Sequence, residues 1–513
     1  SAVLRQLINE SVSAMTSTEA SRGIDAGNCR ITGTKIGLRL LFEMEPVTMM
    51  VDLKPYPAMR DSGVPWLGVV PSHWDVHKLR SLLDGVAERN QPDLPLLSVV
   101  REKGVTLRDT INQDDNHNYI PDDLRNYKVV RAGQFAMNKM KAWQGSYGIS
   151  RYDGIVSPAY FVFKLRGVEN KFFHSAIRSK TYVSFFSQAS DGVRIGQWDL
   201  SQARMREIPF LIPPADEQKM IVRFLDHSDR RIRKYIRAKQ KLIKLLEEQK
   251  RAIIHRAVTR GLDPDVRLKP SGVEWLGDIP EHWEKRRIHG VFRERNERGV
   301  PDLPILMVSI AAGVTISNEI GEDGRPKRLI EDRDLYKVAR KGDIAYNMMR
   351  MWQGAVGVAP VDGLVSPAYV VAQPYNGVDS KYFELLFRTE ACKRDLVSRS
   401  RGIVDDRNRL YWDGFKDLRV PVPPYEEQMR IIKIITTGVS SLEMLLARLH
   451  HEINLFREYR TRLIADVVTG KLDVREAAAN LPDETDEPEP PEEVEEPTEN
   501  GTDESVGKVP NEE

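Results

Sequence analysis

One stretch of the sequence occurs twice, and this duplication limits the possible folds more than any other feature. Residues 62–68 read SGVPWLG, and residues 271–277 read SGVEWLG, 209 positions later. Further blocks recur near the same offset: His73-Trp74 with His282-Trp283, PDLP at 92–95 and 301–304, and SPAY at 157–160 and 366–369. Such self-similarity indicates a tandem duplication. We therefore expect two globular domains of the same fold, one after the other in the chain.

A long amphipathic helix is predicted after each copy, at 217–260 and at 427–469. In the second helix apolar residues recur every seven positions: Ile435, Leu442, Leu449, Phe456 and Leu463. The first helix has the same apolar stripes, interrupted by charged residues: Asp229, Lys239 and Lys250. Acidic residues open each helix, and Gly261 or Gly470 follows it, as is typical of helix ends. The heptad spacing predicts coiled-coil helices.

The order of these elements predicts their direction. The ends of a compact domain tend to lie close together. The first helix carries the chain away from the first domain, and the second helix must then run back from the second domain. We expect an antiparallel coiled coil that separates two inverted domains with pseudo-twofold symmetry. Duplex DNA has matching symmetry and is a suitable ligand for such a pair.

Each globular domain is expected to be a mixed α+β fold. Short β-branched and aromatic runs at 155–163 and 364–371, set between Gly, Pro and Asp, predict strands. The stretches 171–188 and 381–398 have apolar residues three and four positions apart, and each predicts a helix.

The predicted boundaries are a first domain at 55–215, a central helix at 216–261, a second domain at 262–425 and a C-terminal helix at 426–475. Residues 1–54 lack the repeat, and we expect an extension that is disordered or derived from upstream sequence. An ordinary N-terminal arm packing on the fold is the alternative. Residues 476–513 are rich in Glu and Pro and poor in large apolar side chains, so we expect a disordered acidic tail.

Charge is distributed unevenly along the 513 residues, whose net charge is +1. Residues 476–513 hold 15 acids and one base, which leaves 75 bases and 60 acids, or +15, on residues 1–475. A basic folded part is compatible with nucleic acid but is a weak signal alone. No apolar run approaches the roughly 18 residues that span a membrane. The 2 cysteines form neither a disulfide framework nor a zinc site, which fits the cytoplasm.

The repeated blocks resemble those of the specificity subunit of Type I restriction-modification systems. The resemblance covers residues 55–475. It rests on the lead-in at 63–74 with its repeat, on the Pro-Pro-x-x-Glu-Gln helix starts at 213–218 and 423–428, and on the Trp-Gln-Gly to Ser-Pro-Ala-Tyr block of each half. The two halves are more alike than is usual in that family, which leaves open whether their DNA half-sites are related.

The resemblance implies a non-catalytic subunit with two target recognition domains that bind a bipartite site on double-stranded DNA. It also implies docking of two modification subunits, which methylate adenine with S-adenosylmethionine, and of restriction subunits that cleave DNA. This chain would bind no cofactor itself, whereas S-adenosylmethionine, Mg and ATP would serve the partner subunits. A stand-alone DNA-binding protein or a coiled-coil scaffold without a methylase partner is the alternative.

The sequence contains no motif of a stand-alone enzyme. The Pro-Pro-Tyr motif of amino-methyltransferases needs Asn, Asp or Ser at its first position, where this chain has Val422 and, in the first copy, Ile212. Glycine-rich cofactor loops, a P-loop and zinc-spaced Cys or His are also missing. We therefore expect no catalytic, cofactor or metal site in this chain.

The block around each Trp-Gln-Gly is the first candidate DNA contact. Amide and cationic side chains read base edges, and Lys and Arg neutralise phosphates. The candidates are Asn138, Lys139, Lys141, Gln144 and Tyr147 in the first copy and Asn347, Arg350 and Gln353 in the second. Alternatively, the block recurs because both domains need the same turn and core packing.

The segments in which the two halves differ are the second candidate. These are 112–123 against 317–331 and 194–202 against 399–410. Different DNA sequences would be read by residues that differ on a shared scaffold, although unconstrained surface loops would also vary. The cationic candidates there are Arg194, Arg401, Arg407 and Arg409. A basic stretch at 230–241 of the first helix could likewise face DNA or only solvent.

Overall fold

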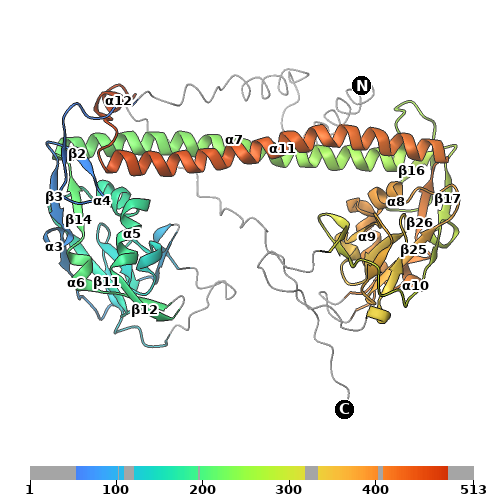
Figure 1. Ribbon diagram of the computed structural model, residues 1–513, viewed down its shortest axis with the longest axis horizontal. Coiled ribbons are helices and arrows are strands. Elements are labelled where there is room, and N and C mark those ends of the chain that lie inside the picture. The colour runs from blue at the N-terminus through green and yellow to red at the C-terminus, as the bar shows by residue number, and fades with distance from the viewer. Residues whose placement is uncertain are drawn as a thin grey trace, which may run out of the picture. The chain divides into compact units, whose positions relative to one another are not determined.

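The computed structural model describes residues 53–101, 103–108, 121–194, 197–317, 333–402 and 408–482. They form two compact units. The central unit is Asp229–Arg460, and the terminal unit comprises the described residues of Val47–Ser228 and Thr461–Glu513. Each unit contains one globular domain and parts of both long helices, α7 (Ala215–Arg260) and α11 (Tyr425–Val468) (Figure 1). The mixed helices and strands confirm an α+β fold.

The two globular domains have the same strand order. The first domain has a four-stranded antiparallel sheet in the order β4 (Leu83–Gly85), β11 (Tyr160–Leu165), β8 (Phe135–Asn138) and β9 (Tyr147–Ile149). The second domain repeats it with β18 (Phe292–Glu294), β25 (Tyr369–Pro374), β22 (Ile344–Asn347) and β23 (Val356–Val358). The duplication seen in the sequence is therefore a duplication of one fold.

Antiparallel two-stranded pairs surround each sheet. In the first domain they are β1 (Met59–Asp61) with β2 (Val69–Pro71), β3 (Asp75–Lys78) with β14 (Pro209–Ile212), β5 (Leu97–Val100) with β6 (Gly104–Leu107), β7 (Lys128–Val130) with β10 (Gly154–Val156), and β12 (Ser190–Arg194) with β13 (Gln197–Leu200). In the second domain they are β15 (Leu268–Pro270) with β16 (Asp278–Pro280), β17 (Glu284–Arg287) with β26 (Arg419–Val422), β19 (Leu306–Ser309) with β20 (Gly313–Ile316), and β21 (Lys337–Ala339) with β24 (Gly363–Val365).

The helix predicted in each domain is two helices in the structure. They are α4 (Asn170–Ile177) and α5 (Lys180–Gln188) in the first domain, and α8 (Ser380–Phe387) and α9 (Glu390–Arg399) in the second. Single helices over 171–188 and 381–398 were therefore wrong. Ser179 and Thr389 have extended backbone before the second helix, and the Thr389 side chain accepts from the backbone N–H of Cys392. An N-cap residue of this kind ends one helix and starts the next.

Short helices complete each domain. They are α3 (Leu79–Leu82), η2 (Ala142–Gln144) and α6 (Gln202–Arg206) in the first domain, and η3 (Ile288–Gly290), η4 (Arg333–Leu335), η5 (Met351–Gln353) and α10 (Trp412–Phe415) in the second. No helix among the described residues is long and apolar enough to cross a membrane.

The core of the second domain extends into both long helices. Its buried aromatic residues include Trp283, Tyr382 and Phe415, and the same cluster contains the following helix residues: Ala257 and Val258 from the end of α7, and Ile431 and Ile435 from the start of α11. Burial of apolar surface thus folds these helix ends together with the domain.

The Pro-Pro-x-x-Glu-Gln motif attaches each long helix to its domain. The nearly buried Glu217 accepts hydrogen bonds from Tyr56 Oη (2.6 Å) and Trp74 Nε1 (3.0 Å), and it contacts His73 Nε2 (2.8 Å). Gln218 accepts from the N–H of Glu169, next to α4, and donates to a proline carbonyl. The motif therefore has a structural role, and His73 takes part in it through its contact with Glu217.

The second copy of the motif makes the same contacts with one loss. Glu427 accepts from Trp283 Nε1 (3.0 Å) and contacts His282 Nε2 (2.8 Å). Gln428 accepts from the N–H of Asp379 (2.9 Å), next to α8. Asp265 stands 209 positions after Tyr56, so no tyrosine reaches the second glutamate from that position.

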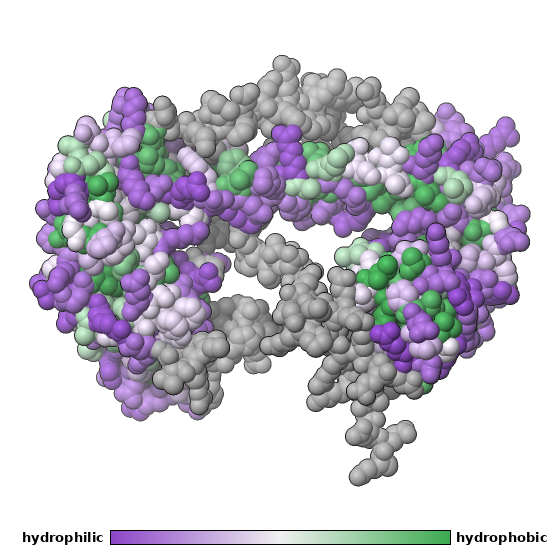
Figure 2. All heavy atoms as spheres, in the orientation of Figure 1, coloured by the Kyte–Doolittle hydropathy of each residue, from purple (hydrophilic) through white to green (hydrophobic). Residues whose placement is uncertain are grey.

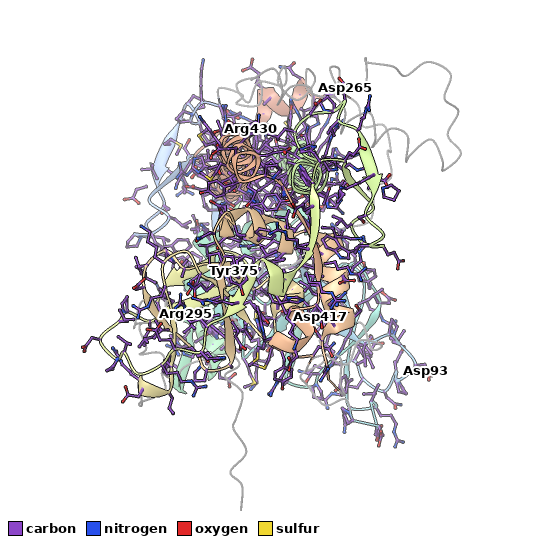
Figure 3. All side chains as sticks on the ribbon, turned by 90° about the vertical axis from the view of Figure 1, so that its right-hand side faces the viewer. Asp93, Asp265, Arg295, Tyr375, Asp417 and Arg430 are labelled. Atoms are coloured by element: carbon purple, nitrogen blue, oxygen red, sulfur yellow. The ribbon has the colours of Figure 1, made fainter. Side chains whose placement is uncertain are left out.

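In the central unit, α7 and α11 lie side by side and run antiparallel (Figure 1 and Figure 3). The charged residues that interrupt the apolar stripes of α7 pair with α11: Lys250 with Glu443 (2.6 Å), Lys239 with Glu452 (2.6 Å), and Asp229 with Arg460. From one ion pair to the next, the residue number increases in α11 and decreases in α7. The two helices are therefore antiparallel. Tyr235 and Phe456 also stack, with ring centroids 6.0 Å apart.

The helix end predicted at 469 is confirmed, because α11 ends at Val468 and is followed by Gly470 at φ 74°. The domain boundary at 475 was too late for the helix, and the tail was predicted to start too early. The backbone N–H of Asp473 then donates to Lys54 O, and α12 (Arg475–Ala479) follows. Arg223 donates to the carbonyl of Leu481. Residues 476–482 therefore pack on the terminal unit, whereas 1–52 and 483–513 lie outside the described residues.

We predict that replacing Glu217 with alanine lowers the free energy of unfolding of the terminal unit by about 2–5 kcal/mol. The change leaves the buried donors of Tyr56 and Trp74 without an acceptor, at about 1–3 kcal/mol each. Denaturant unfolding measures the loss, with Asp216→Ala as the control because the Asp216 side chain is 89% exposed. Equal losses in the two variants would contradict the role of Glu217.

Candidate nucleic-acid interface

In each domain the Trp-Gln-Gly block forms a tight turn directly after one strand of the four-stranded sheet. This strand is β8 in the first domain and β22 in the second. In the first domain the short helix η2 ends at Gly145 with φ 93°, and in the second η5 ends at Gly354 with φ 99°. Only glycine adopts this left-handed conformation without steric cost. We call residues 138–145 and 347–354 the first and second amide turns. The glycine recurs in both turns because their backbone conformation requires it. This agrees with the alternative that the block recurs because both domains need the same turn.

The asparagines of the amide turns hold the turns in place. Asn138 is 9% exposed; its Nδ2 donates to Tyr160 Oη (3.1 Å), and its Oδ1 accepts from the N–H of Met140 (3.1 Å). Asn347 Oδ1 accepts in the same way from the N–H of Met349 (2.9 Å). Both asparagines are thus occupied locally and position the residues that follow them.

Tyr147 is a correction to the predicted set. Its side chain is fully buried, and its ring lies 4.4 Å from that of Phe186 and 5.9 Å from that of Phe135. A three-residue strand such as β9 does not reveal from sequence which face is buried. Tyr147 therefore packs in the core and does not face a ligand.

The remaining turn candidates reach the surface to different degrees. Lys141 is exposed, while Lys139, Gln144, Arg350 and Gln353 are half-buried. Lys139 Nζ lies 3.2 Å from a carboxylate oxygen of Asp199. Gln353 Oε1 is buried and has no hydrogen-bond partner in the part of the chain that the structure describes. These residues stay predictions as DNA contacts.

The β12–β13 hairpin packs against the first amide turn. The N–H of Leu200 donates to Lys139 O (3.2 Å), and Trp198 stacks on Trp143 with ring centroids 5.3 Å apart. In the second domain the N–H of Leu410 donates to Met348 O (2.8 Å). The fold thus brings the two candidate groups to one surface in each domain, although Lys139 and Asp199 are 60 positions apart in the sequence.

The cationic candidates of the variable segments are only partly described. Arg401 and Arg409 are exposed and directly opposite each other in an antiparallel bridge. Arg194 belongs to β12, but its side chain lies outside the described part. Arg407 lies outside the described residues, as do 112–120 and 318–331.

The basic stretch of α7 does not all face outward. Lys239 pairs with Glu452 of α11, and its exposed side-chain fraction is only 17%. Arg233 pairs with Asp229 one turn earlier (2.7 Å). Some of the cationic side chains of this stretch are therefore paired with acids of α7 or α11. Residues 230–241 do not form one uniform cationic surface.

Two arginines at equivalent positions of the domains were missed in the sequence. Arg178 donates to Gly145 O (3.4 Å) of the first amide turn and to Arg101 O (2.8 Å), which ties the turn to the end of β5. Arg388 occupies the same position and donates to the carbonyls of Ile310 and Ala311. Arg178 and Arg388 are 210 positions apart, which matches the offset of the repeat, and this match could have identified them from the sequence.

A half-buried histidine lies close to Arg178 in the first domain. His174 Nδ1 accepts from the N–H of Ile149 (3.1 Å). Burial, followed by the charges of Arg178 and Arg151, lowers the pKa of His174 to about 4. In the second domain Glu384 occupies this position, and one of its carboxylate oxygens lies 3.3 Å from the N–H of Val358. The imidazole is therefore neutral near pH 7 and acts as a fixed acceptor.

Other possible sites are weaker. A cavity of about 480 Å³ in the second domain has balanced charge, with Arg287, Arg399 and Arg419 against Glu274, Asp395 and Asp417 among its lining residues. Asp417, labelled in Figure 3, already pairs with Arg287 (3.0 Å). No group of three His, Cys, Asp or Glu suitable for a metal ion occurs in the described ranges.

Comparisons with known proteins agree on one family. No protein-family model matches the sequence. A protein of Methanocaldococcus jannaschii, named as a candidate type I restriction enzyme MjaX specificity subunit, is 18% identical over 448 residues, which cover 80% of this chain and 96% of that protein. The resemblance predicted from the repeated blocks is thereby confirmed.

Solved structures include chains with a similar fold. A chain from a structure titled for complex assembly and conformational transition of the type I R-M system is 15% identical, with a TM-score of 0.57; the match covers 79% of this chain and 99% of that one. The HsdS subunit of Thermoanaerobacter tengcongensis is 18% identical with a TM-score of 0.45, over 78% of this chain and 96% of that one. The first of these matches shows a shared fold.

We predict that the stability of the terminal unit falls as the pH is lowered from about 6.5 to about 4. Over this range the unfolded histidine binds a proton that the folded His174 does not, so the free energy of unfolding decreases by up to about 3 kcal/mol. Denaturant unfolding at several pH values measures the effect. The His174→Gln variant should lose this component, whereas His451→Gln, at an exposed position, should keep it. Equal pH dependence in both variants would contradict the assignment.

Proposed function

We propose that this chain, which resembles type I specificity subunits in sequence and fold, is the non-catalytic DNA sequence-specificity subunit of a type I restriction-modification complex. The observation that carries the proposal is the pairing of an amide turn with a neighbouring segment of different sequence in each domain. Lys139 and Leu200 meet in the first domain, as Met348 and Leu410 do in the second. Two equivalent surfaces with different side chains suit the two halves of a bipartite site.

Double-stranded DNA is the proposed ligand of both surfaces. The amides of Gln144 and Gln353 suit base edges, and the cations of Lys141 and Arg350 suit phosphates. Asn138 and Asn347 would act by holding the turns. Lys139 in the first domain and Arg401 and Arg409 in the second would contribute from the same surfaces, and Arg194 and Arg407 stay predicted DNA contacts.

The long helices are proposed to set the distance between half-sites. Antiparallel pairing in the central unit and the repeat offset support an antiparallel coiled coil with pseudo-twofold symmetry. In such an arrangement the two domains would meet the duplex in inverted orientation. The gap between half-sites would then depend on helix length.

The outer faces of the helices are the proposed docking surface for two modification subunits. Apolar side chains are exposed there: Met429 (42%), Met444 (68%) and Leu455 (50%) on α11, and Leu245 (47%) on α7. Figure 2 shows hydrophobic residues between hydrophilic ones along the visible helix surface. Exposed apolar groups of this kind are typical of protein interfaces. Restriction subunits would join this assembly in the cytoplasm, and S-adenosylmethionine, Mg and ATP would be bound by the partner subunits.

The proposal predicts a bipartite methylation motif. The chain is co-expressed with its modification subunits, and methylated adenines are mapped across the host genome by single-molecule sequencing. The expected result is a two-part motif with a fixed gap that disappears when this gene is deleted. Unchanged methylation after deletion would contradict the proposal and favour a DNA-binding or scaffold protein without a methylase partner.

A second prediction tests the role of helix length. One heptad is inserted into α7 between Lys239 and Lys250, and one into α11 between Glu443 and Glu452, so that both ion pairs keep their partners. Seven residues at about 1.5 Å each add roughly 10 Å, or about 3 base pairs, to the gap. The methylation map should show a longer gap with unchanged half-sites. An unchanged gap in a folded, active variant would contradict this role.

The matched control inserts the heptad into α7 alone. This shifts Lys239 relative to Glu452 and leaves seven residues of one helix without partners, so the control should lose stability and methylation. Equal activity of the single and paired insertions would show that the helix pairing does not set the gap.

A further inference from the structure

One cross-strand pair next to the amide turn has opposite charge in the two domains. In the first domain Asp191 is paired with Asp199 across β12 and β13. In the second domain the pair is Arg401 and Arg409, which exchange backbone hydrogen bonds of 3.0 and 2.9 Å. The positions are equivalent because the next residue, Leu200 or Leu410, donates to the amide turn in each case.

The acidic pair of the first domain is neutralised by its neighbours. Lys139 Nζ lies 3.2 Å from Asp199, and Arg204 forms an ion pair with Asp191. Two acids are thus matched by two bases. At this pair of positions the first domain therefore has no net charge that would attract a phosphate.

In the part of the second domain that the structure describes, the ion pairs that neutralise the acidic pair of the first domain have no counterparts at Arg401 and Arg409. The charge of Arg401 does contribute, after that of Lys416, to the lowered pKa of Asp413. Met348 replaces Lys139, and Gly414 replaces Arg204. A Cβ at Gly414 would lie 2.8 Å from Arg399 O, so the backbone leaves no room for a side chain there. The nearby Asp413 pairs with Lys416 (2.5 Å). Among the residues that the structure describes, no carboxylate forms an ion pair with Arg401 or Arg409.

Two like charges directly opposite each other destabilise an antiparallel pair of strands. An anion between the guanidinium groups removes that repulsion and gains charge-assisted hydrogen bonds, for which phosphate is well matched. Arg401 and Arg409 are both exposed, and no carboxylate of the described residues forms an ion pair with either of them. To read a base edge, a guanidinium group must be held in a fixed position. Because these two arginines are exposed and no described carboxylate holds them, they favour contact with the DNA backbone over contact with a base edge.

We infer that Arg401 and Arg409 form a clamp for a DNA phosphate in the second domain, and that the first domain has no equivalent clamp. The inference rests on the proposed function and adds that the two domains contribute differently to DNA binding. The second domain supplies more of the salt-dependent binding, whereas at this strand position the first domain has ion-paired side chains beside the stacked Trp143 and Trp198. The same strand position thus determines how each half-site is held.

The test is DNA binding by the complex of the full chain with its modification subunits, measured over a range of salt concentrations. A duplex containing the mapped motif is the probe. For Arg401→Gln/Arg409→Gln, the slope of log K against log salt should fall in magnitude by about 2, because two phosphate contacts are lost. Affinity near 0.15 M salt should fall about 30-fold if both lines meet near 1 M. The methylated motif should stay the same.

Two variants control for folding and for position. Arg401→Lys/Arg409→Lys keeps both charges and should keep the slope. Asp191→Asn/Asp199→Asn changes the equivalent pair of the first domain and should not reduce it. An unchanged slope in the glutamine variant, or an altered half-site in its methylation map, would overturn the inference. If the proposed function is wrong, the wild-type complex itself shows no sequence preference. If only the clamp is wrong, the wild-type complex still binds the motif selectively, and the two failures can thus be told apart.

Discussion

A glutamate at the start of each long helix, buried at Glu217 and half-buried at Glu427, fixes that helix to its domain, and the rest of each unit depends on this contact. Glu427 binds Trp283, and in the same unit the end of α7 passes over this tryptophan at Gly261, where an added Cβ would lie 3.3 Å from the ring. In the terminal unit Glu217 binds Trp74, which Gly470 approaches in the same way. Each tryptophan therefore marks the place where one helix begins and the other ends.

The sequence was sufficient for features that depend on local patterns or on the repeat. Duplication, helix ends and the direction of the helices followed from heptads, glycines and the offset. The charged interruptions of α7, such as Lys239, had no explanation until the structure paired them with acids of α11. The contact between Leu200 and Lys139 joins distant segments, and no local pattern encodes it. Tyr147 was misjudged because a short strand carries too little alternation to identify its buried face.

Comparison of the two domains separates charges that support the scaffold from charges that vary. Arg131 pairs with Glu88 and Asp153 in the first domain, and the second domain has the same three-residue network around Arg340. Next to the amide turns, by contrast, an acidic pair is replaced by an arginine pair. A scaffold kept by ion pairs and buried aromatic rings can therefore present different chemistry at one surface. Under the proposed function, this division would let one fold contact two half-sites with different side chains.

The central claim is that one chain reads DNA at two places through its two domains. Footprinting of the purified complex with its modification subunits on a duplex containing the mapped motif tests it most directly. The account predicts two protected segments separated by a gap, and substitution of the Lys141 and Gln144 side chains by alanine should weaken only one of them. A single continuous protected segment, or equal weakening of both segments, would contradict the account.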